Sequence, residues 1–140
     1  MIAVLAAFLA IAMQAGTPVG LAMRTLAKGD QSFVDDAKQA VARTPAEWLA
    51  LWRQHDPERR PPAVDFAREM VVGVFLGSRP TAGWTLEIVS ATSEGDALVV
   101  RYREVAPPSG AVTAQVITSY HHIVALPKTP ATVRFEKAAR

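Results

Sequence analysis

The run REMVVGVFLG, from Arg68 to Gly77, constrains the fold of this chain more than any other segment. A strand with one exposed face alternates apolar and polar residues, whereas this run is apolar on both alternating faces. Such a strand lies in the interior of a sheet and is covered on both sides. The chain has 140 residues, of which 50% are hydrophobic and 20% charged, so one globular domain can supply that cover.

Further strands are predicted before and after this run. WTLEIVSA and ALVVRYREVA alternate apolar and polar residues around the turn sequence TSEGD, so residues 83–106 are predicted to form a hairpin with one wet face. The remaining predicted strands are a first strand over 19–27, one long bent strand or two strands over 112–127, and a terminal edge strand over 131–137. Residues 33–43 are predicted to form a loop and a short strand, with a short helical segment as the alternative.

One helix is predicted, from Pro45 to about His55. Thr44 is a suitable N-cap, Pro45 fits the first helical position, and Glu47 is placed to accept from the N–H of the cap residue. An apolar stripe at spacings of three and four predicts that this helix packs on the sheet through its two tryptophans; the stripe consists of Trp48, Leu51, Trp52 and His55. The predicted fold class is therefore α+β, an antiparallel twisted β-sheet or sandwich with one amphipathic helix packed on it.

The first sixteen residues, MIAVLAAFLAIAMQAG, are uncharged and largely apolar. They are too short to span a bilayer but are typical of the apolar region of a secretory signal, with small residues near the end that allow cleavage. We expect a signal peptide over 1–16, or an uncleaved N-terminal anchor as the alternative, followed by a single domain over 17–140. The expected location is the periplasm, the cell envelope or the medium. The chain has no cysteine, which excludes disulfides, a thiolate nucleophile and an acylated cysteine.

The remaining composition argues against several function classes. The net charge is only +2 and is scattered, so no nucleic-acid partner is expected. His121 and His122 are neighbours on a predicted strand and must point to opposite faces, so no metal site is expected. The serines lack the context of a nucleophile elbow. Gly77 and Gly83 precede no helix and cannot complete a phosphate cradle. The chain is predicted to be no enzyme and to need no cofactor.

The succession EWLALW, PAVDF, MVVGVFLGSRPTAGW, APPSG and SYHHIVALPK covers roughly residues 44–135. It resembles the C-terminal domain family of PrcB, a protease-complex subunit of bacterial envelopes. The resemblance implies a non-catalytic, exported accessory domain that associates with a protease or stabilises it. Ala82 and Ser119 stand where that family tends to have glycine and proline. Without a cysteine to acylate, membrane association is expected only through an uncleaved N-terminal segment.

Two alternatives compete with this interpretation. RPTAGW is similar to a loop of the chagasin-type inhibitors of cysteine proteases, whose immunoglobulin-like sandwich inserts three loops into an enzyme cleft. SEGDA and REVAPPSG are weaker matches to the other two loops. The second alternative is a structural envelope domain without a dedicated partner.

The segment GSRPTAGW is the candidate partner-binding site under either binding hypothesis. Pro80 fixes its own φ and Gly83 can adopt a positive φ, so the loop is constrained and loses little entropy on docking. Tryptophan and arginine are enriched among interface hot spots, although Trp84 also begins an apolar strand face and is expected to pack inward. The candidate protein-binding residues are Arg79, Pro80, Thr81, Gly83 and Trp84.

Overall fold

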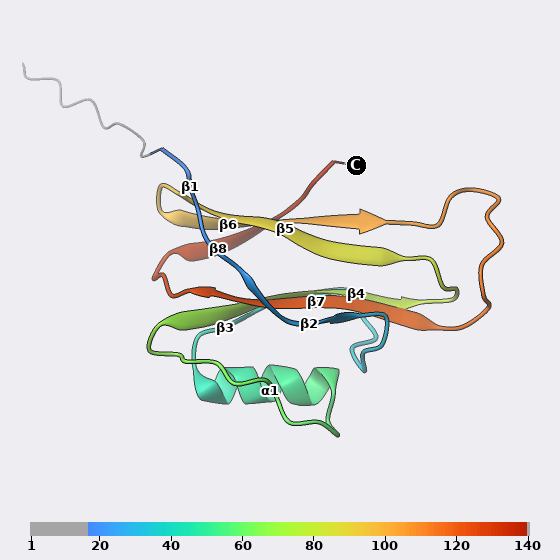
Figure 1. Cartoon of the computed structure of the whole chain (residues 1–140), viewed down its shortest axis with the longest axis horizontal. Coiled ribbons are helices and arrows are strands. Elements are labelled where there is room, and N and C mark those ends of the chain that lie inside the picture. The colour runs from blue at the N-terminus through green and yellow to red at the C-terminus, as the bar shows by residue number, and fades with distance from the viewer. Residues whose placement is uncertain (1–16, 140) are drawn as a thin grey trace, which may run out of the picture.

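The computed structural model describes residues 17–139, which form a sandwich of two four-stranded sheets with one helix outside it (Figure 1). The predicted fold class is confirmed. One sheet has the order β1-β5-β6-β8, with β1 (Val19–Gly20), β5 (Thr85–Glu94), β6 (Ala97–Val105) and β8 (Thr132–Lys137). The other has the order β2-β7-β4-β3, with β2 (Arg24–Gly29), β7 (Thr118–Pro127), β4 (Glu69–Arg79) and β3 (Lys38–Ala42).

The central strand β4 is covered on both faces, as its sequence predicts. One face packs against the β5-β6 sheet through Met70, Val72, Val74 and Leu76, all of which are buried. On the opposite face, Val71 and Phe75 belong to a second cluster with residues of the helix α1 (Pro45–His55). The two cores share β4 and its neighbour β7, so both depend on the same pair of strands (Figure 1).

The helix α1 begins and ends as predicted, and its apolar stripe is buried against the sheet. The Thr44 side chain accepts from the N–H of Glu47 at 3.2 Å. The Glu47 carboxylate accepts from the N–H of Arg43 at 3.4 Å, one residue before the cap residue that was predicted. Both tryptophans also hold the proline-rich segment that follows the helix. The indole N–H of Trp48 donates to Pro62 O at 3.1 Å, and that of Trp52 donates to Arg59 O at 2.9 Å.

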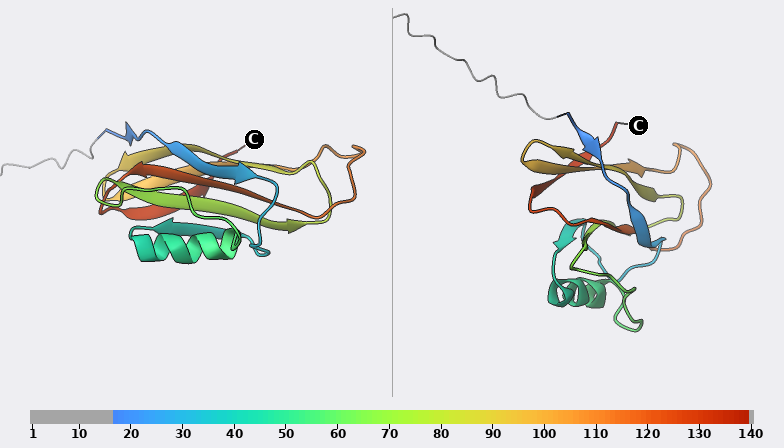
Figure 2. Two further views of the ribbon diagram at one scale, coloured as in Figure 1. Left: turned by 60° about the horizontal axis from the view of Figure 1, so that its bottom comes forward. Right: turned by 60° about the vertical axis from the view of Figure 1, so that its left-hand side comes forward.

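The predicted first strand is wrong in one respect, because 19–27 divides between two sheets. β1 pairs with β5, and β2 pairs with β7. Leu21 and Met23 lie between the two strands and pack against the core of the sandwich. Their burial explains the division, since the chain crosses from one sheet to the other at this point (Figure 2).

The predicted strand over 112–127 begins only at Thr118, and residues 106–117 form an irregular connection. The partner of β7 at this end is β4, whose last residue, Arg79, pairs with Thr118. Residues before Thr118 therefore have no neighbouring strand with which to form a ladder. The connection extends beyond the ends of the strands, where Figures 1 and 2 show it in orange.

The sheets are not antiparallel throughout. β8 is an edge strand, as predicted, but it pairs with β6 in the parallel direction. The short turn after β7 brings the chain to the other sheet at the end where β7 stops, so β8 runs in the same direction as β6 (Figure 1). Within residues 17–139, no helix is long and apolar enough to cross a membrane.

An irregularity near the end of β4 depends on Gly77. The register between β4 and β7 shifts between Phe75 and Ser78, and Gly77 has a φ of 79°. A Cβ atom on Gly77 would lie 2.7 Å from Ala37 N and 2.9 Å from Asp35 O, both backbone atoms. The absence of a side chain at this register shift therefore allows the β2–β3 connection to approach β4 closely.

We predict that Gly77→Ala destabilises the domain more than Gly110→Ala does. The two glycines have the same φ of 79°, but nothing lies within 4 Å of a Cβ atom built on Gly110. The left-handed backbone alone should cost about 1–2 kcal/mol in either variant. In Gly77→Ala the displaced backbone should raise the loss to about 3 kcal/mol or more. Urea unfolding measures both, and equal losses would show that the contact with residues 35–37 is unimportant.

Candidate functional site

Two connections meet at one end of the sandwich, the β4–β5 loop and the β6–β7 connection (Figures 1 and 2). The Thr118 hydroxyl donates to Thr81 O at 2.9 Å, and the N–H of Ala82 donates to Ala114 O at 3.0 Å. We call residues 79–84 and 106–117 together the loop-end surface. The hydrogen bonds fix its two parts relative to each other.

Gly83 allows the two parts to meet. Its φ is 96°, as its position in the loop led us to expect. A Cβ atom on Gly83 would lie 2.9 Å from Pro107 Cγ and 3.3 Å from Thr113 Cγ2. A larger residue would therefore strain the backbone and also push the β6–β7 connection away.

The five predicted binding residues lie together, but they differ in exposure. Trp84 is half-buried and packs against the core of the sandwich. The Arg79 guanidinium lies over its ring, with Cζ 4.9 Å from the ring centroid. Arg79 and Thr81 are half-buried, whereas Pro80 and Gly83 are exposed. The loop is thus anchored by a stacked pair and exposes Pro80 and Gly83 to solvent.

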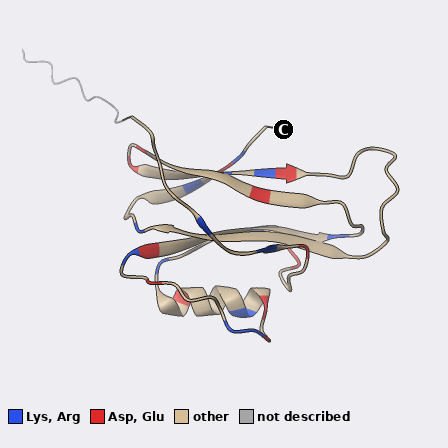
Figure 3. Ribbon diagram, in the orientation of Figure 1, with Lys and Arg blue, Asp and Glu red and all other residues tan. Residues whose placement is uncertain are grey.

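The β6–β7 connection adds an apolar area that the sequence analysis missed. Val112 is 102% exposed, Ile117 73% and Val116 53%. Residues 106–117 contain no charged side chain, and Figure 3 shows this connection without blue or red. Alternation in VTAQVITSY favoured a strand, and a strand would have buried part of these side chains. Exposed apolar groups gathered in one place are typical of interaction sites.

The arrangement of the loops departs from that of the inhibitor alternative. REVAPPSG enters the loop-end surface beside RPTAGW, but SEGDA forms the β5–β6 turn at the opposite end of the sandwich (Figure 1). The ten residues of β5 separate the two ends by about 30 Å. The third loop at the RPTAGW end is instead the β2–β3 connection, where Asp35 O accepts from the N–H of Ser78 at 2.8 Å.

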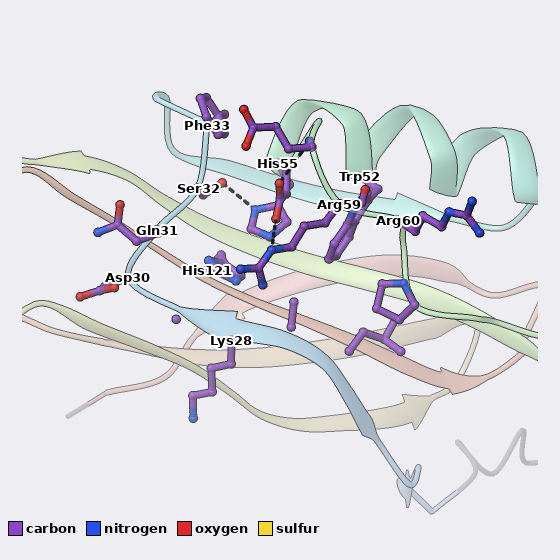
Figure 4. A pocket seen from close by; sticks show the side chains of 16 residues that line it. Lys28, Asp30, Gln31, Ser32, Phe33, Trp52, His55, Arg59, Arg60 and His121 are labelled. Atoms are coloured by element: carbon purple, nitrogen blue, oxygen red, sulfur yellow. Dashed lines mark hydrogen bonds and ion pairs between the residues drawn. The ribbon is translucent and has the colours of Figure 1, made fainter.

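A pocket of about 780 Å³ lies between β2, the end of α1 and the segment that follows the helix (Figure 4). Its polar centre consists of His55, His121 and Ser32. His55 Nδ1 lies 2.8 Å from Ser32 Oγ, and the two imidazole rings are 4.1 Å apart. The pocket is also lined by Trp52, Lys28, Asp30, Asp56, Glu58, Arg59 and Arg60. In Figure 4 the Arg59 side chain extends toward the two histidines, whereas Lys28 points away from them.

Both histidines of the pocket favour the neutral state. Burial lowers the pKa of His55, which the nearby Asp56 carboxylate partly opposes. Burial, with a smaller contribution from His55, lowers the pKa of His121 to about 4. The charged side chains that line the pocket are balanced, three basic and three acidic. The pocket therefore has no evident preference for an anion or a cation.

His122 faces the opposite side of the sheet from His121, as predicted for neighbours on a strand. The N–H of Ile88 donates to His122 Nδ1 at 2.8 Å, so the ring proton is on Nε2, which lies 3.0 Å from Thr25 Oγ1. Burial, followed by the charge of Lys28, lowers the pKa of His122 to about 4. Among residues 17–139 no group of three or more potential metal ligands is present.

We predict that acid destabilises the domain through His121 and His122. Because their pKa values are lower in the folded state, at about 4, than in the unfolded state, at about 6.5, the unfolded chain binds more protons between these values. Stability should fall by about 2 kcal/mol for each histidine between about pH 7 and about pH 5. Urea unfolding at both pH values should show a smaller dependence in His121→Gln and in His122→Gln. Unchanged dependence in both variants would contradict the assignment.

Comparison with known proteins bears on residues 70–127, which match the family model described as PrcB C-terminal. The comparisons with curated proteins and with solved structures found no match. The matched segment begins in β4 and ends with β7, so it includes the central strands of both cores and the whole loop-end surface. The resemblance to the PrcB C-terminal family seen in the sequence is confirmed over this segment.

Proposed function

We propose that this chain is an exported, non-catalytic protein-binding domain that serves as an accessory or stabilising subunit of a protease complex. The observation that carries the proposal is the loop-end surface, where Val112, Val116 and Ile117 are exposed on a connection fixed against the RPTAGW loop. Large exposed apolar side chains cost free energy in a free domain, and burying them against a partner recovers it.

The loops of the loop-end surface are held in place before a partner binds. The two parts of this surface are joined by the hydrogen bond between Ala82 and Ala114, the neighbouring Thr118 of β7 binds Thr81 O, and Gly83 packs directly against Pro107. A surface that is already ordered loses less conformational entropy on binding than a mobile loop does. The stacked pair of Arg79 and Trp84 adds two residue types that often dominate binding energy.

The chemistry of this surface suits binding better than catalysis. Apart from Arg79, residues 79–84 and 106–117 contain no acidic or basic side chain and no cysteine. General acid–base catalysis needs a group that exchanges protons near the working pH, and an arginine does not.

A protease as the partner and export of the chain are further parts of the proposal. The first is supported by the PrcB C-terminal match, because the family resemblance implies a subunit of a protease complex. The second is supported by the apolar run over 1–16, which lies outside the described residues. Anchoring to the membrane would require that this run stays uncleaved.

We predict that the chain captures a peptidase from the envelope fraction of cells that express it naturally, and that Val112→Asp abolishes the capture. Val112 is 102% exposed, so the substitution should leave folding unchanged while placing a charge in an apolar interface. Quantitative mass spectrometry should show that the variant captures about tenfold less peptidase than the unmodified chain, or none. N-terminal sequencing of the recovered chain should show that it begins near Thr17.

The matched control is Val19→Asp, the same substitution at an exposed valine of β1, outside the loop-end surface. It should capture the peptidase as well as the unmodified chain does. If the unmodified chain captures no peptidase, the proposal that its partner is a protease is wrong. Equal losses in both variants would remove the loop-end surface from the proposal. Inhibition of papain by the purified chain would favour the inhibitor alternative instead.

A further inference from the structure

We propose that the loop-end surface recognises an extended peptide segment of its partner in which a carboxylate lies among apolar side chains, the carboxylate binding Arg79. This inference rests on the proposed function and adds the chemistry of the segment that is bound. It is carried by the charges around Arg79 and by the apolar side chains that adjoin it.

Arg79 is the only charged side chain of the loop-end surface, and no acidic side chain of residues 17–139 forms an ion pair with it. Its Nε is buried and has no hydrogen-bond partner within those residues. The stack on Trp84, and not a carboxylate, therefore holds the guanidinium in place.

Three carboxylates on neighbouring elements already have partners. Glu104 of β6 binds Lys137 of β8 at 2.8 Å, and Glu87 of β5 lies 3.6 Å from Lys28. Asp35 of the β2–β3 connection accepts from the Ser78 hydroxyl at 3.1 Å. Lys137 is close enough to Arg79 for the two positive charges to oppose each other. A carboxylate from outside would meet a guanidinium that has no carboxylate partner within residues 17–139.

Two of the apolar residues directly precede the strand partner of Arg79. Arg79 pairs with Thr118 in the β4–β7 ladder, and Ile117 and Val116 immediately precede Thr118. Val112 continues the apolar part along the same connection, which the hydrogen bond between Ala82 and Ala114 holds against the RPTAGW loop. A segment lying along this surface would place apolar residues next to its acidic residue.

A peptide fits these features better than an anionic membrane does. Surfaces that bind anionic lipids by charge carry several basic side chains beside the apolar groups that enter the bilayer. The connection 106–117 has none (Figure 3), and Arg79 is half-buried. One recessed guanidinium is better suited to one carboxylate than to a charged plane.

The test uses a phage-displayed library of random dodecapeptides selected on the immobilised chain, with binding of the selected peptides measured by fluorescence anisotropy. We expect the selected sequences to contain Asp or Glu flanked by apolar residues. Arg79→Gln should weaken the binding of these peptides about tenfold, since it removes a charge-assisted hydrogen bond. Arg53→Gln, an exposed arginine in the last turn of α1, is the matched control and should bind as the unmodified chain does.

Several results would overturn this inference. They are selection of no peptide, selection of peptides without acidic residues, and equal binding by Arg79→Gln and the unmodified chain. Thermal unfolding of Arg79→Gln checks that a loss of binding does not reflect a loss of folding, and Arg79→Lys, which keeps the charge, should recover part of the binding. Sedimentation of the chain with vesicles of phosphatidylglycerol, lost in Val112→Asp, would favour a membrane surface and also overturn it.

The two proposals can fail separately. If acidic, apolar peptides bind at Arg79 but no peptidase is captured, the chemistry of the surface stands and the proposed partner class does not. If a peptidase is captured in a manner sensitive to Val112→Asp but not to Arg79→Gln, the proposed function stands and the role of the carboxylate does not.

Discussion

The structure depends on one constraint, which is that β4 is apolar on both of its faces. Neither face of such a strand can be exposed to solvent, so it needs a second sheet on one side and a further element on the other. Here the β5-β6 sheet covers Met70 and Leu76, while α1 covers Val71 and Phe75. The helix is fixed by the same requirement, because its two tryptophans belong to the outer cluster and also hold the segment 56–62 through their indole N–H groups.

The end of β4 determines where the candidate site forms. The register shift at Gly77 brings the β2–β3 connection against β4, and the ladder with β7 ends at the pair of Arg79 and Thr118. Beyond this pair neither strand has a partner, so the chain continues as two irregular connections that leave the sandwich at the same place. Gly83 then allows these connections to pack together. The loop-end surface is thus a consequence of how the central ladder stops, and the family match covers both the ladder and the surface.

Much of the fold could be predicted from local patterns, whereas the site could be predicted only in part. The helix bounds followed from Thr44 and Pro45, and the hairpin of β5 and β6 followed from alternation around a turn. The separation of His121 from His122 followed from strand geometry. The apolar area at Val112 and Ile117 could not be predicted, because its exposure depends on where the ladder between β4 and β7 ends. That point is set by tertiary packing and not by the local sequence. The stack of Arg79 on Trp84 and the meeting of His55 with His121 depend in the same way on contacts between distant segments.

The central claim is that this domain acts through the loop-end surface, and amide hydrogen exchange of the chain alone and bound to its captured peptidase tests it most directly. The account predicts slower exchange in residues 79–84 and 106–117 of the complex, with no change at the β5–β6 turn around Gly95. Protection confined to the pocket around His55 and His121, with none at the loop end, would contradict it.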